Sequence, residues 1–334
     1  MFDKYLIDMK NPDDALVWRH NKVTLSVMSK FTPAFGPEQK DEIGGIAMRC
    51  TAPEKEFTGK STEIFYHEHL QGCETFFIAE GEWEFISLGR KLTLRPGDLL
   101  HVQPFQGHAF RPLSSNSRLI VMFQGMDMRY AKERSDYMQA HFPEIAGTPE
   151  FKNQMQLHTH AQPRDNSYYY DIAPEGDSPA HRRFGEGIRS HALPGMTLNL
   201  IIARYETHGV KEVWEACMKS GLRMEFATPR YDHRLFWVRE GKIKFNIDGT
   251  EFAAGPDMLV YVPPFHTFTL ETVEDSDMVD LSCPYLLQDL LEELHLTRAK
   301  RPEKLGDPEF MAGLLADFRA EPVKYTYDGR PGII

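Results

Sequence analysis

Hydrophobic and polar residues alternate with a period of two along most of this chain. In the second half, Phe236, Val238, Ile243, Phe245 and Ile247 alternate with polar residues, which is typical of strands that bury one face. These runs are short, and turns that contain glycine, proline or aspartate separate them. The pattern predicts an all-β protein, with a sandwich or barrel of the jelly-roll type.

The same layout occurs twice, although the two copies share few identical residues. Residues 74–85 and residues 234–245 each read as a strand, a glycine turn and a second strand. Each copy continues through a hairpin turn, a turn that ends in aspartate and an apolar strand to a histidine, at His108 and at His266. The sequence therefore predicts two tandem jelly-roll barrels.

A second period, of three to four residues, predicts a few peripheral helices. It appears in residues 126–142, in the leucine repeat of residues 286–294, and in residues 310–318, which follow a helix start signal at Asp307–Pro308.

These helices and the intervening segment suggest domain boundaries. Residues 161–189 are rich in proline, glycine, aspartate and serine, as a surface linker would be. We expect an N-terminal barrel with a trailing helix in residues 1–148, a linker in residues 149–190, and a C-terminal barrel with trailing helices in residues 191–334.

Composition narrows the range of partners and locations. The chain has 334 residues, 41% hydrophobic and 12% aromatic, which is enough for two packed domains. Its net charge of −11 argues against a nucleic-acid partner. No apolar run reaches the roughly 20 residues that span a bilayer. The first residues do not resemble a secretory signal, and the four cysteines show no paired spacing. We expect a cytoplasmic monomer or homodimer that binds a small molecule and no membrane.

The main candidate for chemistry is a group of four potential metal ligands. His67 and His69 are alternate residues of one predicted strand and therefore project to the same face. If the chain turns back at Gly72, Glu74 returns to the same interior, and His108 closes the site from a neighbouring strand. Three imidazoles and one carboxylate suit one divalent ion of Fe, Mn, Ni, Co, Cu or Zn, whereas calcium prefers more oxygen ligands. The alternative is that these histidines are structural and satisfied by hydrogen bonds.

These residues resemble the cupin superfamily, whose first motif is Gly-x5-His-x-His-x3,4-Glu-x6-Gly and whose second is Gly-x5-Pro-x-Gly-x2-His-x3-Asn. The residues that match are His67, His69, Glu74 and Gly81 in the first motif, and Gly97, Asp98 and His108 in the second. Three positions depart from the motifs: the leading glycine is displaced, at Gly59, the proline is one position late, at Pro104, and Gly107 directly precedes the histidine.

The resemblance covers both halves, so the chain looks like a bicupin, similar to quercetin 2,3-dioxygenase-like proteins. That similarity implies a metal ion held by three histidines and one glutamate. It also implies that Glu74 both binds the metal and accepts a proton from the substrate.

The second half lacks most of these ligands. Ala227 and Pro229 stand at the positions of the two strand histidines, and Arg234 stands at the position of the glutamate, so that only His266 remains. We therefore expect one metal ion per chain, in the N-terminal barrel. The C-terminal barrel is then either a scaffold or a site where Arg234 binds an anionic ligand. As a structural residue, Arg234 would pair with Asp232 or Glu225.

Three functions remain open on the sequence alone. The first is a metal-dependent dioxygenase, for example an iron enzyme, that acts on an aromatic or enol-containing small molecule. Its catalytic residue would be Glu74, and its substrate would contact Phe65, Phe76, Ile78 and Phe105. The second is a non-oxidative isomerase, lyase or decarboxylase of a hydroxy acid or sugar derivative, and the third is a ligand-binding or sensor protein.

Overall fold

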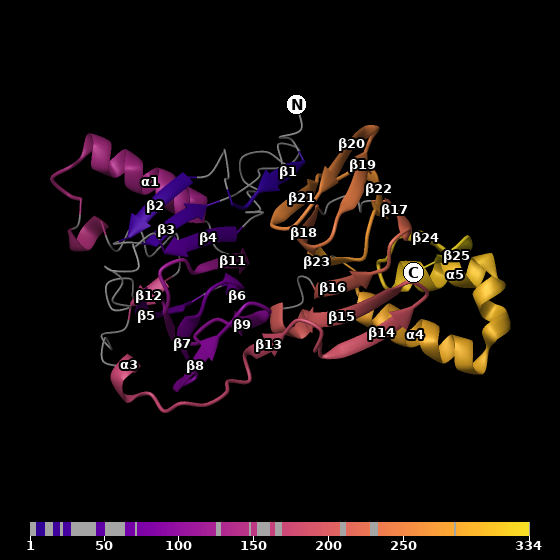
Figure 1. Ribbon diagram of the computed structural model, residues 1–334, viewed down its shortest axis with the longest axis horizontal. Helices are drawn as coiled ribbons and strands as arrows, with labels where there is room; N and C mark the ends of the chain where they lie inside the picture. Colours follow the sequence, from indigo (N-terminus) through magenta and orange to yellow (C-terminus); the bar gives the residue numbers. More distant parts are fainter. Residues whose placement is uncertain are drawn as a thin grey trace. The chain divides into compact units, whose positions relative to one another are not determined.

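The structure is a computed structural model. It describes residues 5–10, 16–20, 23–27, 45–50, 64–70, 72–124, 128–146, 148–151, 161–163, 169–207, 212–227, 233–283 and 285–333. These residues form two compact units (Figure 1). The N-terminal barrel is Pro12–Phe184, and the C-terminal barrel is Gly185–Ile334 together with Met1–Asn11.

The N-terminal barrel contains two antiparallel sheets. Its strands are β2 (Leu16–His20), β3 (Val23–Val27), β4 (Gly45–Cys50), β5 (Ile64–His69), β6 (Cys73–Glu80), β7 (Trp83–Ser87), β8 (Arg90–Leu94), β9 (Asp98–Val102), β10 (His108–Pro112), β11 (Arg118–Gln124), β12 (Ala161–Pro163) and β13 (His181–Arg183). One sheet has the order β12-β5-β10-β7-β8 and the other β13-β9-β6-β11-β4-β3-β2. The helices of this unit include α1 (Met128–His141) and the short α3 (Tyr169–Ile172).

The C-terminal barrel has the same construction. Its strands are β1 (Leu6–Asp8), β14 (Arg189–Leu193), β15 (Met196–Ile202), β16 (Glu212–Met218), β17 (Arg223–Ala227), β18 (Arg234–Glu240), β19 (Ile243–Ile247), β20 (Thr250–Ala254), β21 (Met258–Val262), β22 (Thr267–Thr272), β23 (Ser276–Cys283), β24 (Lys324–Tyr327) and β25 (Arg330–Ile333). The sheet orders are β1-β21-β18-β23-β16-β15-β14 and β20-β19-β22-β17-β24-β25. The helices are α4 (Leu287–Lys300) and α5 (Pro308–Asp317), with short 3-10 turns η4 (Arg204–Thr207) and η5 (Pro302–Gly306).

This architecture confirms the predicted fold class of two tandem β barrels with a few peripheral helices. The alternation of each strand places one apolar face between the two sheets of its unit, where Phe76, Phe85 and Phe110 are buried in the N-terminal barrel. The predicted helices correspond to α1, α4 and α5. At the start of α5, the side chain of Asp307 accepts hydrogen bonds from the backbone N–H groups of Glu309 and Phe310, as the start signal requires.

Two pairings connect segments that are distant in sequence. β1 pairs with β21 of the C-terminal barrel, with Leu6 opposite Val260. β12, from the segment expected as a linker, pairs with β5, with Ala161 opposite His69. The domain boundaries at residues 148 and 190 stay a prediction.

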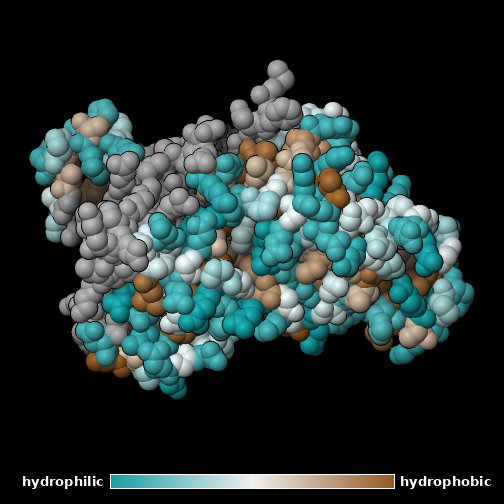
Figure 2. Space-filling view, in the orientation of Figure 1, coloured by the Kyte–Doolittle hydropathy of each residue, from teal (hydrophilic) through white to brown (hydrophobic). Residues whose placement is uncertain are grey.

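The surface fits a protein whose apolar strand faces are covered. On the face shown in Figure 2, hydrophobic residues are scattered among hydrophilic ones. Exposed large apolar side chains, such as Leu88 and Leu296, come from separate elements. No helix among the described residues is long and apolar enough to cross a membrane.

The glycine turns of the repeat have a steric cause. Gly81 and Gly241 connect the first two strands of each copy and have positive φ angles of +71° and +77°. A Cβ atom at either position would collide with the chain that enters the last long strand, at Ser117 and at Ser276 respectively. The two copies therefore share a close backbone approach as well as a turn conformation, and only glycine satisfies both.

This close approach predicts a stability difference between two glycines of the C-terminal barrel. Gly249→Ala, at φ +84° in open space, should cost roughly 1–2 kcal/mol from backbone conformation alone. Gly241→Ala should cost about 1–3 kcal/mol more, because its Cβ meets the backbone oxygen of Asp275. Urea unfolding of both variants measures the difference, and equal losses would show that the close approach is unimportant.

Candidate metal centre

The four candidate ligands come from three strands and from both sheets of the N-terminal barrel. His67 and His69 lie on β5, and His108 begins β10, which pairs with β5 so that His108 is opposite His67. Glu74 lies on β6 in the other sheet, where it pairs with Val102 of β9. Because alternate residues of these strands face the interior, all four side chains point into the space between the sheets.

The four side chains converge inside the barrel. Each offers one ligand atom, and these atoms lie within 4.8 Å of one another. All four residues are buried, between 0% and 6% exposed. The ring of His67 lies 4.2 Å from that of His108 and 5.0 Å from that of His69, centroid to centroid. This is the donor set and the spacing that one divalent transition metal ion requires, so the residues present fit such an ion.

Glu74 is held as a carboxylate by its neighbours. Its Oε2 lies 2.7 Å from His108 Nε2 and 3.2 Å from His69 Nε2. Burial alone would raise the pKa of Glu74, but the charge of His69 and the hydrogen bonds from His108 and His69 outweigh burial. They keep the pKa well below its ordinary value. An ionised carboxylate between imidazole nitrogens is the form that binds a metal ion.

The ring of His108 is oriented by the backbone. Its Nδ1 donates a hydrogen bond to the carbonyl oxygen of Gln106 at 3.1 Å, which leaves Nε2 to face Glu74 and the centre. The side chain of Gln106 in turn donates to Ser87 Oγ at 2.7 Å, on the strand next to β10. The loop before His108 therefore fixes which nitrogen is available as a ligand.

Gly107, one of the departures from the cupin motif, has a structural reason. A Cβ atom at this position would collide with the ring and hydroxyl of Tyr66. Tyr66 lies on β5 between Phe65 and His67, so the loop that carries His108 packs directly on the strand that carries two other ligands. The absence of a side chain at Gly107 lets these ligand-bearing segments approach each other.

An aromatic wall lies against the candidate centre. Phe76, two residues after Glu74, has its ring 5.6 Å from that of His108 and 4.9 Å from that of Phe110. Phe85 completes this group, stacked 5.2 Å from Phe110. Ile78 is buried in the same core. The sequence analysis named Phe76 and Ile78 as substrate contacts but missed Phe85 and Phe110. Alternation along the strands places both missed residues inside the barrel, and Phe110 lies two residues after His108.

The other two predicted substrate contacts lie differently. Phe105 is 68% exposed, and its backbone, at φ +62°, donates a hydrogen bond to the carbonyl of His69 at 2.7 Å. The side chain of Phe105 therefore belongs to the surface of the loop and not to the described barrel interior. The side chain of Phe65 lies outside the described residues. Contact of either side chain with substrate stays a prediction.

Known structures share this fold. The structure resembles the oxalate decarboxylase of Lactobacillus farciminis, solved as a formate complex, with 12% identity and a TM-score of 0.51. The match covers 91% of this chain and 96% of that one. The oxalate decarboxylase of Bacillus subtilis at pH 4.6 matches over 89% of this chain and 82% of that chain, with 14% identity and a TM-score of 0.48. No family model and no curated protein matches the sequence.

The fold is that of a bicupin. At these identities the likeness shows the fold alone, and similarity to quercetin 2,3-dioxygenase-like proteins stays a prediction. The four candidate ligands of this bicupin all belong to its first barrel.

The second barrel of the bicupin carries a different interior at the matching position. Arg234 pairs with Val262 as Glu74 pairs with Val102, which confirms the correspondence expected from the sequence. The partner of Arg234 is Asp280, whereas the expected partner Glu225 is exposed and Asp232 lies outside the described residues. Ala227 has only its backbone described, and Pro229 lies outside the described residues.

His266 keeps only part of the role of His108. Its Nδ1 donates to the carbonyl of Pro264 at 2.8 Å, as His108 does to that of Gln106. Its Nε2, however, faces Asp248 in the hairpin at 3.6 Å. The described residues of the C-terminal barrel therefore place an arginine where the first barrel has its carboxylate ligand.

A second group of potential ligands lies in the C-terminal barrel, formed by Glu215, Cys217 and Asp277. Here Arg239 Nη1 already donates to Glu215 at 2.8 Å and to Asp277 at 2.6 Å. Burial, with the nearby charges of Asp277 and Glu215, raises the pKa of the Cys217 thiol to about 12. A thiol that stays protonated, beside carboxylates bound by a guanidinium group, is a poor metal site.

The two histidines provide a matched test of the metal centre. His108→Ala should lower metal affinity by more than about a hundredfold, since even residues that only orient ligands contribute roughly 10–100-fold. His266→Ala should leave the metal content unchanged, because its Nε2 faces a surface hairpin. Elemental analysis of the purified variants, with thermal unfolding as a control for the fold, checks both. Metal loss in His266→Ala would contradict the assignment to the first barrel.

The contact between Gly107 and Tyr66 gives a second test. Gly107→Ala should push the loop off β5 and weaken metal binding by about 10–100-fold, because it displaces His108 without removing any ligand. Adding Tyr66→Leu should restore much of the affinity by making room for the methyl group. Metal titration of the single and double variants measures this, and failure of the rescue would mean that the glycine acts in another way.

Proposed function

We propose that this chain is a metal-dependent enzyme whose N-terminal barrel holds one divalent transition metal ion through His67, His69, Glu74 and His108. The convergence of these four buried donors is the observation that carries the proposal. Of the two reaction classes considered, dioxygenation of an aromatic or enol-containing small molecule fits the site best. His67, His69, Glu74 and His108 would hold such an ion, iron among the candidates, which would supply a Lewis acid for a substrate hydroxyl or enol oxygen and redox chemistry for dioxygen.

The walls of the barrel support a flat, apolar substrate. Phe76 lies against His108, and Phe85 and Phe110 pack behind it in the buried core. Such rings contribute dispersion and stacking to an aromatic substrate. The same walls exclude water from the interior, which strengthens electrostatic interactions at the ligands.

Glu74 is the proposed proton acceptor. Both imidazole contacts of Glu74 fall on Oε2, so that Oε1 is the oxygen left to receive a proton from a substrate hydroxyl. The hydrogen bond from His108 to Gln106 keeps its ring fixed throughout.

A small dianionic substrate fits less well. A divalent ion with one carboxylate ligand would offset one negative charge of the substrate, so the second would require a further cation beside the ligands. Among the residues of the N-terminal barrel whose side chains the structure describes, Arg118 is the only buried arginine or lysine, and it pairs with Glu80 at 3.0 Å. The described interior therefore favours the apolar substrate class.

A non-oxidative decarboxylase or lyase is the second candidate. It is favoured by the fold shared with the Lactobacillus farciminis oxalate decarboxylase over most of both chains. The same four ligands would serve such a reaction, since the ion that they hold would supply a Lewis acid for a carboxylate or carbonyl oxygen of the substrate. The small-molecule partner, the monomeric or homodimeric state and the cytoplasmic location stay predictions.

Oxygen uptake distinguishes the two candidates. The metal-loaded protein, given a panel of polyphenols and enol-containing compounds, should consume oxygen in proportion to substrate lost. His108→Ala should abolish this uptake, and His266→Ala should retain it. An oxygen electrode with product analysis provides the measurement. Equal turnover without oxygen, or release of carbon dioxide from a carboxylate substrate, would refute the dioxygenase and support the second candidate.

A further inference from the structure

The interior of the C-terminal barrel contains an ion pair at positions that match the metal centre of the first barrel. Arg234 takes the place of Glu74 at the start of the corresponding strand. Asp280 lies opposite Phe236, where the first barrel has Val121 opposite Phe76. A carboxylate and a valine are thus replaced by a cation and an anion, which changes what the interior can bind.

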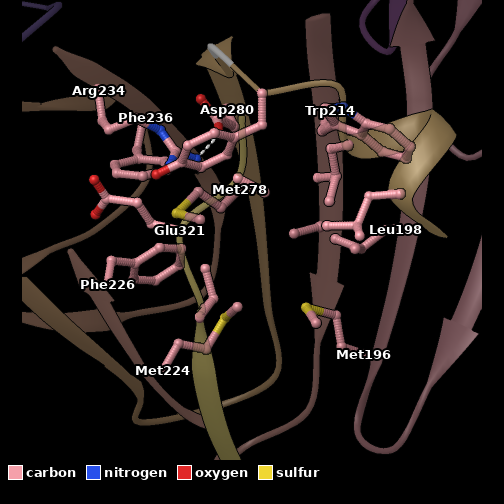
Figure 3. A pocket seen from close by; sticks show the side chains of 16 residues that line it. Met196, Leu198, Trp214, Met224, Phe226, Arg234, Phe236, Met278, Asp280 and Glu321 are labelled. Atoms are coloured by element: carbon pink, nitrogen blue, oxygen red, sulfur yellow. Dashed lines mark hydrogen bonds and ion pairs between the residues drawn. The ribbon is translucent and has the colours of Figure 1, made fainter. Parts of the chain in front are cut away.

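A pocket opens beside this ion pair. It lies within the C-terminal barrel and encloses about 610 Å³ of free space, its open mouth included. In the view of Figure 3, Arg234, Phe236 and Phe226 lie on one side of the hollow and Trp214 and Leu198 on the other.

The guanidinium group of Arg234 is the cationic group in the lining of the pocket. Arg234 is 4% exposed, and its Nη2 donates to Asp280 Oδ2. It lies over the rings of Phe226, Phe236 and Tyr285, between 5.1 and 5.6 Å from their centroids. These contacts fix the guanidinium plane at the wall of the hollow.

One donor of this group has no protein acceptor. The Nε–H of Arg234 is buried and has no hydrogen-bond partner among the described residues. A buried donor without an acceptor costs free energy, which an acceptor atom on a ligand would recover. Arg234 lines the pocket, so an acceptor atom that a ligand placed beside Nε would satisfy this donor in apolar surroundings.

The charges of the lining favour a neutral ligand. Asp280 already offsets the charge of Arg234, and Glu321 adds a further carboxylate to the lining. An anion would meet two carboxylates for one cation, so the anionic ligand considered from the sequence is disfavoured.

The apolar lining favours a flat ligand. Trp214, Phe226 and Phe236 present rings, and the methionines, Met196, Met224 and Met278, present flexible thioethers that adapt to a ring system. Such a lining holds aromatic molecules by stacking and dispersion.

We propose that the C-terminal barrel binds a neutral, flat aromatic small molecule through a carbonyl oxygen that accepts the Nε–H of Arg234. This site is independent of the metal centre and does not require the reaction proposed for the first barrel. It gives the second barrel a binding role in place of a purely structural one.

Three probes of similar size test the ligand class on the full chain. Acetophenone has a neutral carbonyl, benzoate is an anion, and ethylbenzene has no acceptor. Titrations followed by NMR of protein labelled at the methionine methyl groups report binding at the lining methionines. Acetophenone should bind about tenfold more tightly than ethylbenzene, because of the hydrogen bond, and benzoate should bind most weakly. Equal affinities, or a preference for benzoate, would overturn the proposal.

Variants locate the interaction. Arg234→Lys keeps a cation beside Asp280 but removes the Nε donor. The affinity for acetophenone should therefore fall about tenfold, while the affinity for ethylbenzene should not change. Ala216→Leu, which fills the hollow, should weaken the binding of both probes, whereas His108→Ala should leave both affinities unchanged. Binding that survives Ala216→Leu, or that is lost in His108→Ala, would place the ligand elsewhere.

A double variant covers the case in which Arg234→Lys does not fold. Arg234→Met with Asp280→Val replaces the buried ion pair by apolar residues of similar size, a change that proteins commonly tolerate. It should bind acetophenone and ethylbenzene equally. A retained preference for acetophenone would show that Arg234 is not the donor, and the proposal would be wrong.

Discussion

The structure depends on how charge is compensated inside a β barrel. Taking an isolated carboxylate or guanidinium group out of water costs several kcal/mol or more, so a barrel that places one in its interior must supply a counter-charge or a metal ion. The first barrel surrounds Glu74 with three imidazoles from two strands. The second surrounds Arg234 with Asp280 and three aromatic rings. The same barrel fold thus compensates a buried charge in two different ways, with imidazoles in the first barrel and with a carboxylate and aromatic rings in the second.

The properties that follow from strand periodicity could be predicted from the sequence. Alternation gave the fold class, and it also placed His67 and His69 on one face, because a period of two leaves no other arrangement in a regular strand. The turn glycines were visible as a repeat, and their steric cause appears only when Ser117 and Ser276 are seen beside Gly81 and Gly241. The start of α5 at Asp307 could also be predicted, because it depends only on residues next to it in the sequence.

Features set by pairing between distant strands could not be predicted in this way. The sequence suggested partners for Arg234 within about ten residues, yet Asp280 reaches it from β23 because β23 and β18 are neighbours in the sheet. The pairing of β12 with the ligand strand β5 has the same origin. Such contacts depend on sheet order, which hydrophobic periodicity does not encode. Phe85 and Phe110 were missed for a different reason, since alternation marked both but no ligand motif drew attention to them.

The choice of reaction rests on the wall of the site more than on the ligands. Three histidines and a glutamate serve oxidative and non-oxidative chemistry alike, and the fold shared with an oxalate decarboxylase does not select between them. What differs between these chemistries is the substrate, and substrate choice is made by the groups around the centre. In the described interior these groups are aromatic, and the buried Arg118 is committed to Glu80. A divalent ion with one carboxylate ligand would offset a single negative charge, so a dianion would leave its second charge uncompensated there, whereas a flat enol or phenol would bring to the centre only the one oxygen that such an ion would polarise.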